Sequence, residues 1–112
     1  MDPSPEDAKL ITLARSSRAR IDAHEGAAVR DLDGRTYSAA SVTLESLTID
    51  ALPLAVAMAV SSGAKGLEAG AIATNRPGQA IVDLSVVRDI AGIGIPVFVA
   101  DTAGIVSAVQ QS

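Results

Sequence analysis

The 112-residue sequence contains no cysteine and no tryptophan, and only 2% of its residues are aromatic. Without cysteine the chain can form no disulfide and can offer no thiolate to a metal ion. Because 48% of the residues are nonetheless hydrophobic, the core has to be built from Ala, Val, Leu and Ile. The length suits a single small domain over residues 1–112, and we expect residues 1–4 to be disordered.

The sequence also lacks an apolar stretch long enough to span a bilayer and, at its acidic N-terminus, a signal-peptide core. We therefore expect a cytoplasmic protein with no membrane contact. The formal net charge of −4 argues against nucleic-acid binding. The arginines near the end of the first predicted helix are offset by nearby aspartates, so they are interpreted as a solvated surface.

Local signals in the first half predict a helix followed by a β-hairpin. Ser4 can be the N-cap of a helix over residues 5–19, with Pro5 in its first position. The pair Asp33-Gly34 predicts a tight turn between strands at 26–30 and 36–42.

A second helix is predicted over residues 51–60, with Asp50 as its N-cap and Gly63 as its C-cap. It is apolar on nearly all sides, which indicates burial on several faces.

The second half alternates strands and helices. A strand is predicted over 69–74, and a helix over 84–91 with Asp83 as its N-cap and 92–94 as its stop. A strand follows at 95–100, and a last element at 105–109 can be strand or helix. This order predicts a three-layer α/β/α sandwich with a mixed sheet of four or five strands.

Four stretches resemble motifs of the cytidine deaminase family. Residues 26–35 are similar to that family's first hairpin, which leads to an Asn-Val-Glu-Asn stretch. A Cys-Ala-Glu-Arg-Thr-Ala motif then opens the buried helix, and Pro-Cys-Gly-Ala-Cys-Arg opens the next one. A gapless match places 41–44, 52–57 and 83–88 on these three motifs. The resemblance extends over residues 6–109 and implies the family's fold.

The same match replaces every chemical group of the family's zinc site. In the resemblance, Leu52, Leu84 and Val87 stand at the metal-ligand positions and Leu54 at the proton-shuttling glutamate. The ribose-contacting Asn and Glu correspond to Ser41 and Thr43, and a stacking Phe corresponds to Ala23. Aliphatic side chains can neither ligate zinc nor move a proton. We expect these vestigial positions to be buried and close together, filling the former metal pocket with core.

No shift of register restores the site, because the chain has no cysteine and its one histidine, His24, lies outside both motifs. We interpret His24 as a loop or surface residue. Glu45 and Asp50 could form an acid–base pair, but helix capping explains them better.

Polar residues near the vestigial positions define a possible residual pocket: Ser41, Thr43, Ser46 and Ser85. Without a neighbouring base, these hydroxyls and that of Thr48 make no nucleophile. We assign no catalytic residue, no metal and no cofactor.

The sequence therefore predicts a catalytically inactive cytidine-deaminase-like protein that acts through protein–protein contacts, with an unidentified protein partner. The alternative is a nucleoside- or nucleotide-binding protein with a reshaped deaminase pocket. An enzyme with unrelated, metal-free chemistry is a third possibility that no residue constellation supports. Both the resemblance and the high apolar content predict a homo-oligomer, a dimer or a tetramer.

Overall fold

The computed structural model describes residues 2–78 and 82–112. In this part of the chain the elements are α1 (Pro5–Ile21), β1 (Glu25–Asp31), β2 (Thr36–Ala40), β3 (Val42–Thr43), β4 (Thr48–Ile49), α2 (Ala51–Ser61), β5 (Leu67–Thr74), α3 (Ser85–Ala91), β6 (Pro96–Ala100) and β7 (Val106–Gln111). No helix among the described residues is long and apolar enough to cross a membrane.

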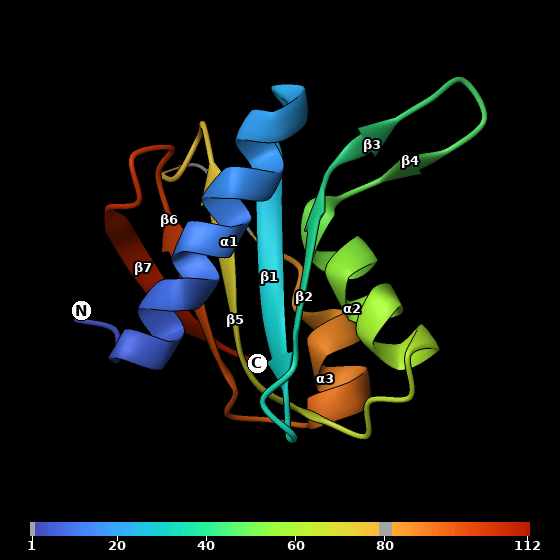
Figure 1. Cartoon of the computed structure of the whole chain (residues 1–112), viewed down its shortest axis with the longest axis vertical. Coiled ribbons are helices and arrows are strands. Elements are labelled where there is room, and N and C mark those ends of the chain that lie inside the picture. Colours follow the sequence, from blue (N-terminus) through green and yellow to red (C-terminus); the bar gives the residue numbers. More distant parts are fainter. Residues whose placement is uncertain (1, 79–81) are drawn as a thin grey trace.

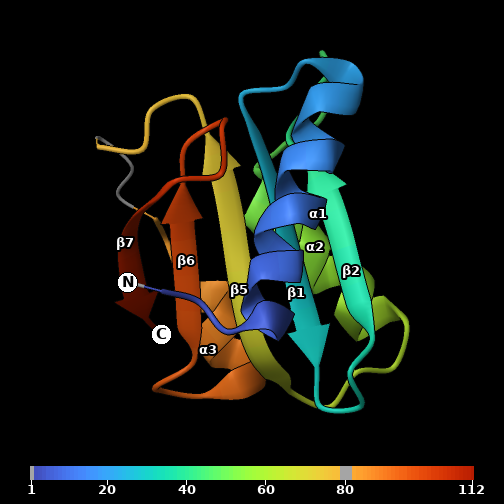
Figure 2. The same ribbon diagram turned by 60° about the vertical axis from the view of Figure 1, so that its left-hand side comes forward.

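Five strands form one sheet in the order β2-β1-β5-β6-β7. The central pair β5–β6 is parallel, and the other three pairs are antiparallel. Helix α1 covers one face, and α2 and α3 cover the other (Figures 1 and 2). The predicted three-layer sandwich with a mixed sheet is thus confirmed, with five strands. The last element, left open between strand and helix, is the edge strand β7.

Two aliphatic cores lie on opposite faces of this sheet because successive strand residues point to opposite sides. Ala27 and Val29 of β1 pack with α2 and α3. Ala28, between them, packs with α1, as do Ala71 and Ala73 of β5. Small side chains dominate the second core, so α1 lies close to the strands.

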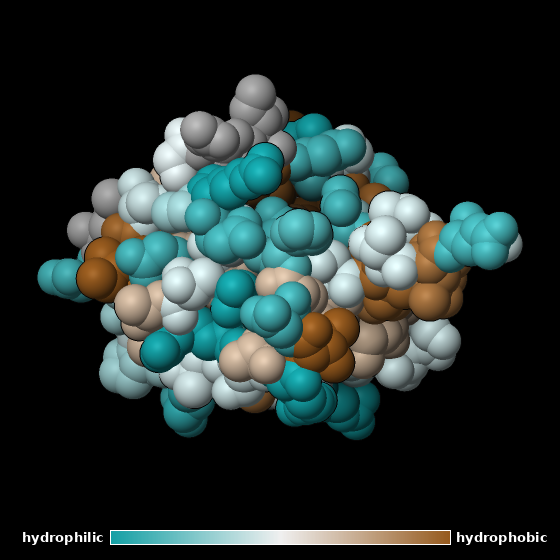
Figure 3. Space-filling view, turned by 90° about the horizontal axis from the view of Figure 1, so that it is seen from above, coloured by the Kyte–Doolittle hydropathy of each residue, from teal (hydrophilic) through white to brown (hydrophobic). Residues whose placement is uncertain are grey.

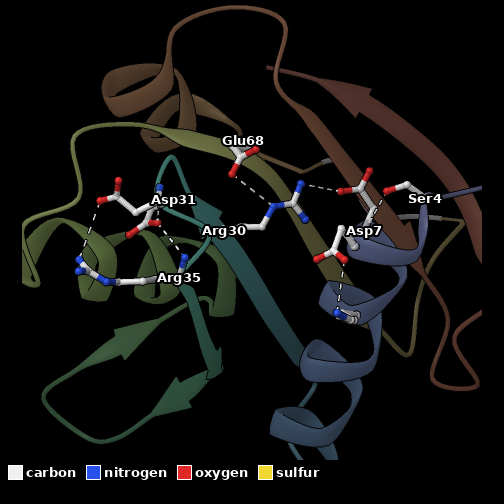
Figure 4. A network of polar contacts seen from close by, with 9 residues as sticks. Ser4, Asp7, Arg30, Asp31, Arg35 and Glu68 are labelled. Atoms are coloured by element: carbon white, nitrogen blue, oxygen red, sulfur yellow. Dashed lines mark hydrogen bonds and ion pairs between the residues drawn. The ribbon is translucent and has the colours of Figure 1, made fainter.

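Gly26 marks the closest approach of α1 to the sheet. A Cβ atom at this position would lie 1.9 Å from the Ala14 carbonyl oxygen of α1. An ion-pair network also joins the helix to the sheet (Figure 4): the Arg30 guanidinium lies 3.0 Å from the Asp7 carboxylate and 3.6 Å from that of Glu68. The absence of a side chain at Gly26 and the ion pairs of the partly buried Arg30 therefore set the position of α1.

The predicted start of α1 is confirmed, because Ser4 Oγ accepts a hydrogen bond from the Asp7 amide at 3.2 Å. Ser4 is thus part of the fold, although we expected residues 1–4 to be disordered; Met1 lies outside the described residues. The helix ends two residues beyond the predicted 5–19. It stops at Asp22, whose left-handed backbone (φ 51°) turns the chain so that the Ala23 amide bonds back to the Arg18 carbonyl, while the Asp22 amide bonds to the Ala19 carbonyl.

The caps of α2 differ in detail from prediction. Asp50 is the N-cap, but its side chain makes no capping hydrogen bond. The C-cap is Ser62, and the predicted Gly63 is the next residue, with φ 95°. The Gly63 amide bonds to Val60 and the Ala64 amide to Ala59, the pattern of a Schellman motif.

At α3, the N-cap position is Leu84 rather than the predicted Asp83. The Asp83 carboxylate still accepts a hydrogen bond from the Ser85 amide at 2.9 Å, so it satisfies a free helix amide from one position earlier. Gly92 ends the helix with φ 75°, as its place before the strand predicts.

The main feature that the sequence did not predict is the arm formed by β3 and β4, which projects from the body of the molecule (Figure 1). Its turn is closed by the Leu44 amide bonding to the Leu47 carbonyl at 2.8 Å. The turn contains no Gly, Asn or Pro, so Ser46 is the one residue in it that favours a turn. Three strand ends also differ by two residues: β2 ends at Ala40 and not at 42, β5 begins at Leu67 and not at 69, and β7 ends at Gln111 and not at 109.

Candidate functional site

The starts of α2 and α3 meet in an aliphatic cluster. Leu52 is 2% exposed, Leu84 4% and Val87 0%, and all three belong to the core between these helices and the sheet. Leu54 is partly buried and packs against the same core. Leu52, Leu84 and Val87 are therefore buried in one aliphatic core, and Leu54 packs against it. That these four positions correspond to the family's zinc site remains a prediction.

A polar hollow of about 520 Å³ lies beside this cluster, at the end of the sheet where β1 begins and β5 ends. Four segments line it: His24 and Glu25, 41–43 next to β2, 48–50 before α2, and 74–76 after β5. Hydrophilic residues dominate much of this end of the molecule, whereas apolar surface gathers on the side of the β3–β4 arm (Figure 3).

A smaller cavity of about 140 Å³ shares Glu25 and Asp50 with the hollow. Its other lining residues are Leu52, Pro53, Ile72, Val82 and Asp83. The two shared carboxylates thus stand where the polar hollow meets the aliphatic cluster.

The backbone around Glu25 is held by the sheet on both sides. Glu25 pairs with Thr74 of β5 across the antiparallel ladder. On the same side, the Asn75 amide bonds to the His24 carbonyl at 3.4 Å. On the other side, the Glu25 carbonyl accepts a hydrogen bond from the Ser41 amide at 3.0 Å. The floor of the hollow is therefore built on regular sheet structure.

The electrostatics of the hollow centre on Glu25. Burial raises the pKa of its carboxyl above the ordinary value, and the negative charge of Asp50 raises it further. The Thr74 hydroxyl and His24 act on that pKa in the opposite direction. A raised pKa from burial and a like charge is common at sites where a ligand supplies the missing partner, although structural networks also produce it.

The structure separates the predicted residual-pocket residues into two groups. Ser41 and Thr43 line the hollow, as does Thr48. Ser46 is exposed in the turn of the β3–β4 arm, and Ser85 is exposed at the start of α3, outside the lining of both cavities. His24 is exposed, as predicted, and borders the hollow.

The partner of Asp50 in the hollow is Glu25 and not Glu45, which is exposed in the turn of the arm. Sequence analysis noted Glu25 only as a neighbour of His24. The one available signal was a carboxylate directly before the apolar run over residues 26–29. A strand that is buried on both faces is expected to be a nearly continuous apolar run, and a carboxylate at its start departs from that pattern.

Chemically, this arrangement offers hydrogen-bond acceptors and hydroxyl groups. Among the described residues no group of three or more His, Cys, Asp or Glu side chains is placed so that it could hold a metal ion. Carboxylates facing a cavity can bind a donor-rich ligand or take up a proton.

Comparison with known proteins supports this description of the fold. A family model described as cytidine deaminase-like matches residues 3–104. No curated protein matches the sequence significantly.

Two solved structures are similar. One is a cytidine deaminase from Burkholderia pseudomallei, with a TM-score of 0.74, 20% identity, and coverage of 91% of this chain and 89% of that one. The other is a cytidine deaminase from Mycobacterium leprae, with a TM-score of 0.68, 17% identity, and coverage of 97% and 94%. At these identities the structures establish a shared fold, and the family model extends over most of the sequence. This chain therefore belongs to the cytidine deaminase-like family.

Proposed function

We propose that this protein is a catalytically inactive member of its family and that it acts through protein–protein contacts. The observation that carries the proposal is the aliphatic cluster at the starts of α2 and α3, where the motif match puts the family's zinc ligands. Zinc in proteins is held by Cys, His, Asp or Glu. The side chains of Leu52, Leu84 and Val87 offer no electron pair, so they do not fit the ion.

The proton-transfer chemistry of a deaminase is missing for the same reason. The matched position of the family's glutamate is Leu54, which packs against the cluster. Deamination needs a group there that takes a proton from water and passes it to the leaving amine. Glu25 and Asp50 line a neighbouring cavity, but no metal-activated water would stand before them.

An apolar groove between α2 and α3 supports the part of the proposal that concerns protein contacts. It is lined by Pro53, Val56, Val60, Val86 and Ile90, among others, and Val60 is 53% exposed. Such a surface on a small acidic protein favours association, and we propose a homodimer or homotetramer.

The hollow favours the alternative, a protein that binds a nucleoside or nucleotide in a reshaped pocket. It is concave, and Ser41, Thr43 and Thr48 supply hydroxyl groups on one side. A ligand site needs a few convergent polar groups of this kind.

Four measurements test the proposals. Elemental analysis of the purified protein should find no stoichiometric zinc, and incubation with cytidine should produce no uridine. One zinc per chain, or uridine formation that a chelator abolishes, would overturn the inactive assignment.

Light scattering over a dilution series should give a multiple of 11.3 kDa; a monomer at high micromolar concentration would refute the oligomer. Equilibrium dialysis with cytidine and uridine tests the alternative, with Thr43→Val as the variant expected to weaken binding.

A further inference from the structure

The strand β7 is an open edge of the sheet. Among the described residues it pairs with β6 alone, and Figure 2 shows it at the end of the sheet opposite β2. An edge strand presents backbone amide and carbonyl groups that no neighbouring strand satisfies. β7 can therefore hydrogen-bond to one more strand.

The direction of these backbone groups follows from the pairing with β6. The Ser112 amide bonds to the Ile95 carbonyl at 3.0 Å, and the Ser112 carbonyl accepts a hydrogen bond from the Gly94 amide at 3.0 Å. In an antiparallel ladder, successive residues turn their backbone groups to alternate sides. Gln111 and Val109 therefore direct their amide and carbonyl groups away from β6, toward the open edge.

This edge lacks the side chains that usually prevent such a strand from pairing with another chain. Natural edge strands are commonly protected by charged residues, by proline or by a bulge. Residues 102–112 contain no charged residue and no proline. A register shift opposite Val99 and Ala100 affects only the start of β7, so residues 108–111 form a regular and unprotected edge.

Apolar surface accompanies the open edge. Ile105, directly before β7, is 67% exposed. Val106 and Val109 are only partly buried, at the margin of the core beneath α1. Helix α1 packs mainly on β1, β2 and β5, so it leaves this margin incompletely covered. A strand added beside β7 would cover apolar side chains as well as satisfy backbone groups.

The edge is complementary to a second copy of itself. When two β7 strands run antiparallel about a two-fold axis at Gln110, Val109 of each chain lies opposite Gln111 of the partner subunit. The outward amide and carbonyl groups of both residues then bond across the interface. The two Gln110 side chains meet at the axis, where each amide group can donate to and accept from the other.

The charge distribution also favours a second copy over a charged peptide. Because the chain carries a net charge of −4, two copies repel each other least where they meet through a surface without charge. Residues 102–112 offer such a surface. A basic or acidic peptide would find no opposite charge in this segment to select it.

We propose that two copies of this protein associate through β7 and join their sheets into one continuous sheet. The proposal rests on the proposed function in one respect, the self-association, and assigns it to the sheet edge instead of the groove between α2 and α3. A contact along one strand is small for a stable interface, so we expect a micromolar dissociation constant.

The test measures the mass of the full chain by light scattering over a dilution series. The wild type should be a dimer at high micromolar concentration. Gln110→Glu places like charges opposite each other at the axis and should raise the dissociation constant about tenfold or more. Gln111→Pro removes an outward amide, which proline can replace at an edge without loss of a bond to β6, and should also dissociate the dimer.

Two further variants and one exchange measurement locate the contact. Thr36→Glu is the matched control, because it adds the same charge to an exposed residue of the opposite edge strand β2, and the dissociation constant should stay within about twofold. Val60→Glu alters the groove between α2 and α3 and should leave a dimer. The Val109 and Gln111 amides should exchange hydrogen more slowly at high than at low protein concentration. Thermal unfolding verifies that each variant is folded.

A wild type that stays monomeric at high micromolar concentration would overturn the edge pairing together with the proposed oligomer. An oligomer that persists in Gln110→Glu and Gln111→Pro but dissociates in Val60→Glu would overturn the edge pairing alone, and the proposed function would stand. Exchange of the Val109 and Gln111 amides that does not depend on protein concentration would likewise contradict only the edge pairing.

Discussion

Replacing Leu84 tests whether the starts of α2 and α3 are core. Leu84 is 4% exposed and belongs to the same buried cluster as Leu52 and Val87. The motif match predicts that this position corresponds to a metal-binding side chain of zinc deaminases. In this protein we expect Leu84→Asp to be strongly destabilising, because it places an unpaired carboxylate inside an aliphatic cluster.

The magnitude follows from two contributions. Truncation of a buried leucine to alanine costs about 2–5 kcal/mol, because hydrophobic transfer free energy is lost and a cavity is left. An unpaired polar group without hydrogen bonds adds about 1–3 kcal/mol. The sum of about 3–8 kcal/mol is comparable to the roughly 5–15 kcal/mol that stabilises a typical domain. Leu84→Asp should therefore be largely unfolded at neutral pH.

Urea unfolding followed by far-ultraviolet circular dichroism suits this chain, which has no tryptophan. Leu84→Ala should remain folded with a free energy of unfolding about 2–5 kcal/mol lower. The matched control is Ile93→Asp, because Ile93 is 88% exposed beside α3 and should change stability by less than about 0.5 kcal/mol.

The reasoning fails if Leu84→Asp loses less than about 1 kcal/mol or matches Ile93→Asp, since a buried site cannot take a carboxylate that cheaply. The pH dependence of the destabilisation gives a second test that the buried charge is its cause. Because a buried Asp is held neutral more easily than charged, the deficit of Leu84→Asp relative to Leu84→Ala should shrink as the pH falls.

Three other predictions concern α1 and two titrating groups. Gly26→Ala should lower stability by about 1–3 kcal/mol or more in thermal unfolding, because the new methyl group would meet a backbone carbonyl of α1; an unchanged Tm would contradict the close approach. Because burial and Asp50 raise the pKa of Glu25, its charged form costs stability as the pH rises from about 4.3 through the raised value. The free energy of unfolding of Glu25→Gln should therefore rise relative to that of the wild type over that pH range. A difference between the two proteins that does not change with pH would refute this. Burial alone would raise the pKa of Asp31, but hydrogen bonds from the Arg35 amide, the Tyr37 hydroxyl and the Asp33 amide lower it. Asp31 thus contributes stability above about pH 3.9 that is lost as the pH falls through the lowered value. In urea titrations, the free energy of unfolding of Asp31→Asn should lie below that of the wild type, by an amount that shrinks in acid. A difference that stays constant with pH would contradict this.

Local signals in the sequence were enough for most of the fold. Ser4 and Pro5 predicted the start of α1, Asp33-Gly34 predicted the first hairpin, and the apolar stretch over residues 51–60 predicted a buried helix. Each depends on residues a few positions apart, so it can be recognised before the chain is folded. The β3–β4 arm was missed because its turn has no Gly, Asn or Pro and its strands pair over only two residues each.

The candidate site was also predicted only in part from the sequence. Its aliphatic half followed from the sequence, because the chain contains no cysteine and a motif match places leucine and valine at the helix starts. Its acidic half did not. Glu25 begins β1 and Asp50 precedes α2, and nothing in the segment between them indicates that their carboxylates share a cavity.

Composition alone thus determined that this protein has an aliphatic core and no thiolate metal site, since both depend only on which side chains are present. Tertiary structure decided which polar groups face one another. The sheet pairs Glu25 with Thr74, and α2 packs on that sheet with its N-terminus beside the end of the pair. Charge in a cavity arises from such long-range packing, because the field at each carboxylate depends on distance through space and not along the chain.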